Sequence, residues 1–142
     1  MLGFPRRPLA AAALLASLTT GGCGYGGATK SCDIRFPPQE APSVEGGRIR
    51  GRVYAICDER PEVHHLEYWL AKRNTNGAFA PASDRRTSDR IPGTRRTDYD
   101  AVTVTCERGV WRVEARATGA LKGTPFDFST FSGNLAVAAA DC

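Results

Sequence analysis

Residues 102–117 read VTVTCERGVWRVEARA, and this stretch decides the fold. Apolar and polar residues alternate on both sides of a short turn at 107–109. A period of two residues is typical of strands that bury one face and expose the other. The stretch therefore predicts two strands, whose buried positions are Val102, Val104, Cys106, Trp111, Val113, Ala115 and Ala117.

The same alternation continues on both sides of this stretch, and no segment after residue 23 has a helical period. The sequence Asn74-Thr75-Asn76-Gly77 favours a tight hairpin turn, because such residues tolerate left-handed backbone angles. Gly119 and Gly123 indicate another turn. Further strands are expected at 49–57, 63–73, 78–81, 126–128 and 135–141, with a polar loop at 81–98.

Six or seven short strands in a chain of this length predict an all-β fold, an antiparallel β-sandwich. About two-thirds of the unfolded surface would be buried in a domain of this size. The residues expected in the core are Leu66, Tyr68, Leu70, Val102, Val104, Trp111, Phe126 and Phe128.

The N-terminus has the layout of an export signal. Two arginines at 6–7 precede an apolar run at 9–18, and Gly21-Gly22 precedes Cys23. A short positive region, a short apolar run and small residues are typical of a secretory signal peptide. This ending resembles the lipobox of bacterial lipoproteins, which implies lipidation of Cys23, although Thr20 stands where leucine is usual.

Two alternatives to a lipid anchor remain open. The protein is freely secreted if the signal is cleaved elsewhere nearby, and Cys23 is then an extra thiol. The arginine pair also resembles a twin-arginine signal, which Pro5 and Pro8 flank poorly. On the lipoprotein interpretation, residues 1–22 are the signal peptide, 23–47 form a flexible arm rich in glycine and proline, and 48–142 form the sandwich.

The cysteine count supports the lipid. Five cysteines leave one unpaired in an exported protein, and lipid on Cys23 leaves four for two disulfides. Four cysteines allow three pairings. We expect Cys57–Cys106, because each ends a strand, and Cys32–Cys142, because they lie at the two ends of the domain.

The net charge of the exported chain is small. The whole chain has a formal charge of +4, and removal of the two arginines of the signal lowers it to about +2. A charge of this size does not indicate nucleic-acid binding.

Four segments carry a resemblance to a group of known proteins. They are a strand that ends at Cys57, the pair His64-His65, the run CERGVWR from Cys106 to Arg112, and a Gly-x-Pro-Phe segment from Gly123. In this order, residues 48–142 resemble small secreted or lipid-anchored proteins of actinobacteria and their phages. The resemblance implies a β-domain and adds almost nothing on function.

The run around Cys106 also resembles the late strand pair of immunoglobulin-like domains. It departs from that pattern at two points. Val104 stands where a tyrosine is expected, and Trp111 follows the second cysteine instead of preceding it. The resemblance therefore implies an immunoglobulin-like architecture and no function.

Groups suited to catalysis or metal binding are few. His64 and His65 are the only histidines, and neighbouring strand residues point to opposite faces, so with Glu62 they fall short of a zinc site. Ser129 and Ser132 lack the Gly-x-Ser-x-Gly turn of serine hydrolases. We therefore predict no catalytic residue, no metal site and no cofactor.

Five arginines in the run RRTSDRIPGTRR are the most unusual cluster in the chain. Arginine suits anionic partners, because its planar fork matches phosphate and carboxylate groups. The alternative is a solvated polar loop, since Asp84, Asp89 and Asp98 dilute the charge. The candidate binding residues are Arg85, Arg86, Arg90, Arg95 and Arg96.

Trp69 is the other candidate for binding. It lies on the polar face of its expected strand, beside His65 and Glu67. An exposed tryptophan can anchor a partner. The alternative is that Trp69 packs under the proline-rich arm or on the second sheet.

These features predict an exported cell-envelope lipoprotein that acts as a non-catalytic binding module. We expect a monomer, anchored to the membrane by lipid alone. Its partner would be a protein or an anionic envelope component, and not nucleic acid. The alternative is a freely secreted hydrolase, or an inhibitor of an envelope enzyme.

Overall fold

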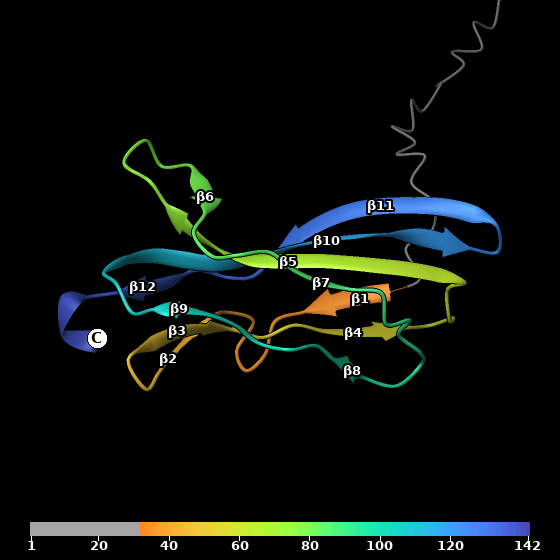
Figure 1. The fold of residues 1–142 in the computed structure, drawn as a ribbon, viewed down its shortest axis with the longest axis horizontal. Helices are drawn as coiled ribbons and strands as arrows, with labels where there is room; N and C mark the ends of the chain where they lie inside the picture. Colours follow the sequence, from red (N-terminus) through yellow and green to blue (C-terminus); the bar gives the residue numbers. More distant parts are fainter. Residues whose placement is uncertain (1–31) are drawn as a thin grey trace, which may run out of the picture.

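The computed structural model describes residues 32–142, and all of its strand pairs are antiparallel. The strands form two layers with a hydrophobic core between them (Figure 1). The all-β prediction is confirmed. The expected signal peptide and Cys23 lie outside the described residues.

The first layer is a six-stranded sheet built on two long strands. These are β5 (Val63–Arg73) and β10 (Gly109–Leu121), which pair from Trp111 opposite Lys72 to Ala120 opposite Val63. The predicted hairpin turn after β5 is confirmed, and Gly77 adopts a φ of 87°. The other members are β6 (Phe79–Pro81) and β7 (Arg86–Ser88) beside β5, and β11 (Thr124–Phe131) and β12 (Leu135–Val137) beside β10.

The second layer consists of two three-stranded sheets placed end to end (Figure 1). The strand expected at 49–57 is divided between them, with a break at 52–53, where the Tyr99 amide donates to the Val53 carbonyl at 3.0 Å. One sheet has the order β1 (Cys32–Arg35), β4 (Tyr54–Cys57), β8 (Thr97–Asp98). The other has the order β2 (Ser43–Glu45), β3 (Arg48–Gly51), β9 (Val102–Thr105).

Three expected loops differ in the structure. The described part of the arm, residues 32–47, contains β1 and β2, and Ile34 and Phe36 of this segment are buried in the core. The polar loop at 81–98 contributes β7 and β8 as edge strands. Gly119 lies within β10, and the turn falls at Lys122-Gly123. The structure of each segment depends on its pairing with a neighbouring strand. The composition of the segment alone does not reveal that pairing.

Most of the expected core is buried. Leu66, Tyr68, Leu70, Val102 and Trp111 are all at most 3% exposed. The other three expected residues are only partly buried and pack against the core from its margin; they are Val104, Phe126 and Phe128. The C-terminal run expected as a strand over 135–141 ends earlier, at Val137, and a short 3-10 helix, η1 (Ala139–Asp141), follows it.

The expected disulfide pairing is wrong. The bonds are Cys32–Cys57 and Cys106–Cys142. Cys32 lies directly opposite Cys57 across the β1–β4 ladder, whereas Cys106 follows the end of β9 that pairs with Arg48. Cys57 is nine residues further along the same strand path than Arg48, which separates the two cysteines by about 30 Å.

Candidate binding surface

The predicted arginine cluster is divided between the two layers of the fold. Arg86 begins β7, which pairs with β5 in the six-stranded sheet. Arg95 and Arg96 directly precede β8, which pairs with β4 in the second layer. The loop therefore crosses between the layers, and its five arginines do not converge on one point.

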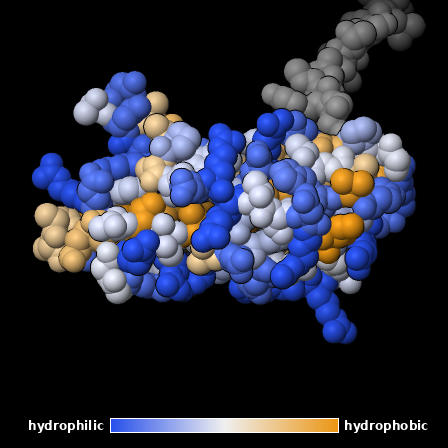
Figure 2. Space-filling model, in the orientation of Figure 1, coloured by the Kyte–Doolittle hydropathy of each residue, from blue (hydrophilic) through white to orange (hydrophobic). Residues whose placement is uncertain are grey.

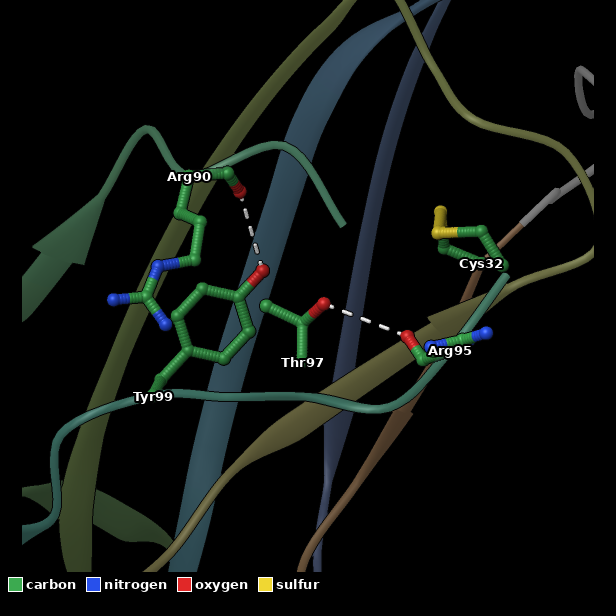
Figure 3. The surroundings of a disulfide bond; sticks show 6 residues. Cys32, Arg90, Arg95, Thr97 and Tyr99 are labelled. Atoms are coloured by element: carbon green, nitrogen blue, oxygen red, sulfur yellow. Dashed lines mark hydrogen bonds between the residues drawn. A yellow bond between two sulfur atoms is a disulfide. The ribbon is translucent and has the colours of Figure 1, made fainter. Parts of the chain in front are cut away.

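The part of this loop that reaches the second layer is held by local contacts. Figure 3 shows the Tyr99 hydroxyl donating to the carbonyl of Arg90 at 3.3 Å, and the Thr97 hydroxyl donating to the carbonyl of Arg95 at 3.5 Å. Burial raises the pKa of Tyr99 to about 12, so this phenol keeps its proton. These contacts hold the loop backbone.

The side chain of Arg96 has its own partners in the second layer. Its guanidinium donates to the Asp98 carboxylate at 2.6 Å and stacks on the Tyr54 ring at 4.1 Å. The hydrogen bond to Asp98 raises the pKa of Arg96. The Arg96 guanidinium is therefore already engaged in contacts within the fold.

Trp69 lies on the outer face of the six-stranded sheet, yet it is only 9% exposed. The guanidinium carbon of Arg85 covers its ring at 4.3 Å. Its indole N–H donates to Glu114, the cross-strand neighbour on β10, at 3.1 Å. The ring is neither freely exposed nor buried between the layers. The hydrogen bond to Glu114 holds the ring in place, and Arg85 packs on it.

A second arginine on this outer face lies between two aromatic rings. The guanidinium carbon of Arg112 is 4.0 Å from the Phe79 ring centre and 4.2 Å from that of Phe131. The same guanidinium donates to the Glu114 carboxylate at 2.5 and 2.9 Å. Phe131 is 62% exposed and is one of three large apolar residues on the surface of the described chain.

These contacts form one continuous network across the sheet. The Glu114 carboxylate accepts hydrogen bonds from both Trp69 and Arg112. Glu67 forms an ion pair with Arg85 at 3.6 Å. The residues come from β5, β6, β10 and β11 and from the connection between β6 and β7. We call this surface the arginine–aromatic face and define it by Trp69, Phe79, Arg85, Arg112 and Phe131.

Sequence reasoning found only Trp69 and Arg85 of this face. The signal for Arg112 was present, since it occupies an outward position in the alternating run of 111–117. Phe79 and Phe131 lie far from Arg112 in the chain. Only the pairing of β6 with β5, and of β11 with β10, brings their rings to it.

The two histidines lie on opposite faces of β5, as predicted. His65 contacts Asp89 at 2.6 Å on the outside, whereas His64 is 1% exposed and packs 6.2 Å from the Phe126 ring. Burial, and then the neighbouring His65, lower the pKa of His64. Among the described residues, no group of three or more histidine, cysteine or acidic side chains could hold a metal ion.

The hydroxyl of Ser132 is used by the fold. It accepts the Val113 N–H at 2.8 Å and donates to the Gly133 carbonyl at 2.8 Å. Ser132 is 4% exposed, so its hydroxyl is not presented to a substrate. Ser129 lies elsewhere, on β11 opposite Arg116.

Comparison with known proteins gives no relative. Neither a family model, nor a curated protein, nor a solved structure matches the chain. Within residues 32–142, no helix has the length and apolar character needed to cross a bilayer.

Proposed function

We propose that this protein is an exported lipoprotein of the cell envelope that binds a partner protein through the arginine–aromatic face and catalyses no reaction. The observation that carries the proposal is Phe131, a phenyl ring 62% exposed and stacked against a guanidinium that is itself fixed by Glu114. An apolar side chain held in solvent at one defined position is suited to contact another surface.

The composition of the face supports protein binding. Residues that dominate binding energy at protein interfaces are enriched in tryptophan, tyrosine and arginine, and aromatic side chains are generally enriched there. Arg112 and Arg85 already have fixed partners, so they lose little conformational entropy when a partner binds. The surface seen in Figure 2 is mostly hydrophilic, with several separate hydrophobic patches.

The export and anchoring part of the proposal rests on the cysteines. Both disulfides of the described chain favour an oxidising compartment. Cys23 is then the one cysteine left over, and it follows the small residues that precede a lipidated cysteine in bacterial lipoproteins. The antiparallel layers fit an immunoglobulin-like sandwich, an architecture that serves many binding proteins.

A photo-crosslinking amino acid placed at residue 131 tests the binding face in the source bacterium. The matched control carries the same amino acid at Ile56, which is 40% exposed on β4 in the opposite layer. We expect a discrete cross-linked product from residue 131 that Arg112→Gln reduces. The same products from both positions, or none from residue 131, would contradict the proposed face.

The anchor has a separate test in the intact mass of the protein, measured without reducing agent and again after reduction. We expect the mass of residues 23–142 plus acyl chains, with a gain of four hydrogen atoms on reduction. An unlipidated chain that retains Cys23 as a free thiol would refute the anchor. The binding face would then belong to a diffusible protein.

A further inference from the structure

A surface groove lies at the base of the β5–β6 hairpin and has a volume of about 610 Å³. One wall is the end of β5 and the start of the turn, from Lys72 to Thr75. The other walls are residues 80–82, at the end of β6, and the turn before β10, which supplies Arg108. The hairpin projects from the body of the fold at this end of the sheet (Figure 1).

The charges of the groove are all of one sign. Its lining includes Lys72, Arg73 and Arg108, and no carboxylate. The two other surface hollows differ: one contains Asp84 beside two arginines, and the other contains both Asp33 and Glu40. Compared with these two hollows, the groove therefore has the environment more favourable to an anion.

The three cations of the groove are not equally free to bind. Lys72 pairs with Glu107 at 2.5 Å and lies 5.4 Å from the Trp111 ring centre. Arg73 lies 5.1 Å from the Phe79 ring centre, and neither Arg73 nor Arg108 has a carboxylate partner within the described chain. These two guanidinium groups remain available for an external anion.

Gly109 allows the turn to approach Lys72 closely. Its φ is 150°, and a Cβ atom there would lie 2.6 Å from Cε of Lys72. A larger residue would displace the end of the Lys72 side chain and would be strained at this φ. Gly109 therefore lets Lys72 lie against the turn that carries Arg108.

We infer that this groove binds a phosphate group that belongs to a larger molecule. Arginine binds phosphate oxygens through parallel N–H donors, and Arg73 and Arg108 supply two such groups. Asn74 and Thr75 add neutral polar groups to the lining. The volume exceeds that of a lone phosphate and lies in the range of small-molecule sites, so it leaves room for the groups esterified to the phosphorus.

This site is separate from the proposed protein-binding function. The phosphate ligand would be either a soluble phosphoester, such as a unit of an anionic polymer, or the headgroup of an anionic lipid. The shared chemistry is a phosphate oxyanion held by two guanidinium groups. Because Phe79 contacts both Arg73 and Arg112, the groove borders the arginine–aromatic face without sharing its arginines.

The test is an NMR titration of the full exported protein in neutral detergent micelles. The probes are glycerol 3-phosphate in one arm and phosphatidylglycerol added to the micelles in the other. We expect saturable shifts of the Gly109 amide and of the Nε–H signals of Arg73 and Arg108. The arm with the lower dissociation constant identifies the source of the phosphate.

Variants decide whether the groove itself is responsible. Arg73→Gln and Arg108→Gln should each weaken binding on the order of tenfold, as expected for the loss of a charge-assisted hydrogen bond. The control Arg60→Gln removes the same charge from an exposed site before the start of β5, away from the groove at its end, and should change the dissociation constant less than about twofold. The inference is overturned if neither probe gives saturable shifts, or if Arg60→Gln weakens binding as much as Arg108→Gln.

Discussion

The buried imidazole of His64 makes the stability of this domain depend on pH. The ring is 1% exposed, and neither ring nitrogen has a hydrogen-bond partner among the described side chains and backbone groups. Burial disfavours the charged form and lowers the pKa of His64 below its ordinary value of 6.5. The folded chain therefore keeps the ring neutral at pH values where the unfolded chain has begun to take up a proton.

The sign and size of the effect follow from this difference. Below pH 6.5 the unfolded chain binds more protons at this position than the folded chain does, so stability is complete above pH 6.5 and falls as the pH decreases. At pH 5.0 the loss reaches about 2 kcal/mol if the ring stays neutral in the folded state. His64→Leu removes this loss. It also removes an unsatisfied buried polar group, which should raise the free energy of unfolding at pH 7.5 by about 1 to 2 kcal/mol.

Urea unfolding followed by tryptophan fluorescence, at pH 7.5 and pH 5.0, measures both quantities. We expect the wild type to lose up to about 2 kcal/mol more than His64→Leu between the two pH values. The control is His65→Gln, which keeps His64 and should therefore keep its loss. If wild type and His64→Leu change equally with pH, the argument from burial is refuted.

Three further substitutions, the first with a matched control, test other parts of the fold. Gly119→Ala should cost about 1 to 3 kcal/mol in thermal unfolding, because a Cβ there would lie 2.0 Å from a backbone carbonyl oxygen, whereas Gly93→Ala meets nothing within 4 Å and should be nearly neutral. Hydrogen bonds from Arg52 lower the pKa of Glu45 to about 2, so stability from this pair is lost only as the pH falls toward that value. In Arg52→Gln, a carboxyl NMR titration should show the Glu45 pKa returning toward 4.5. Ser132→Ala should lower the urea midpoint by the equivalent of about 1 to 3 kcal/mol, since it leaves a buried backbone N–H without its acceptor; an unchanged midpoint would contradict this role.

The disulfide pairing could not be predicted from the sequence. The odd total, together with the hypothesis that Cys23 is lipidated, predicts the four participating cysteines, and they are the four that the structure pairs. The pairing depends on the strand beside which Cys32 lies. Residues 32–36 do alternate apolar and polar side chains, as β1 requires, but this alternation does not show that β1 pairs with β4. A ladder between distant segments is formed by hydrogen bonds to a partner, which local composition does not encode.

The arginine–aromatic face was predicted only in part, because it also depends on pairing between distant strands. Alternation in the sequence placed Trp69 on an outer face, and it gave no sign that Arg85 covers it. The contact of Arg112 with Phe79 and Phe131 joins three strands in one register. A shift of one residue in any ladder would turn the side chains of that strand to the other face.

The sequence by itself determined the all-β class, the central strands and most of the core, because a two-residue period fixes which side chains must leave water together. It also determined which cysteines are available for disulfides. Tertiary structure decided the disulfide pairs, the edge strands β1, β2, β7 and β8, the cover over Trp69 and the cationic groove. Each of these depends on which distant segments pair and in what register, and that choice is made by the whole chain as it packs.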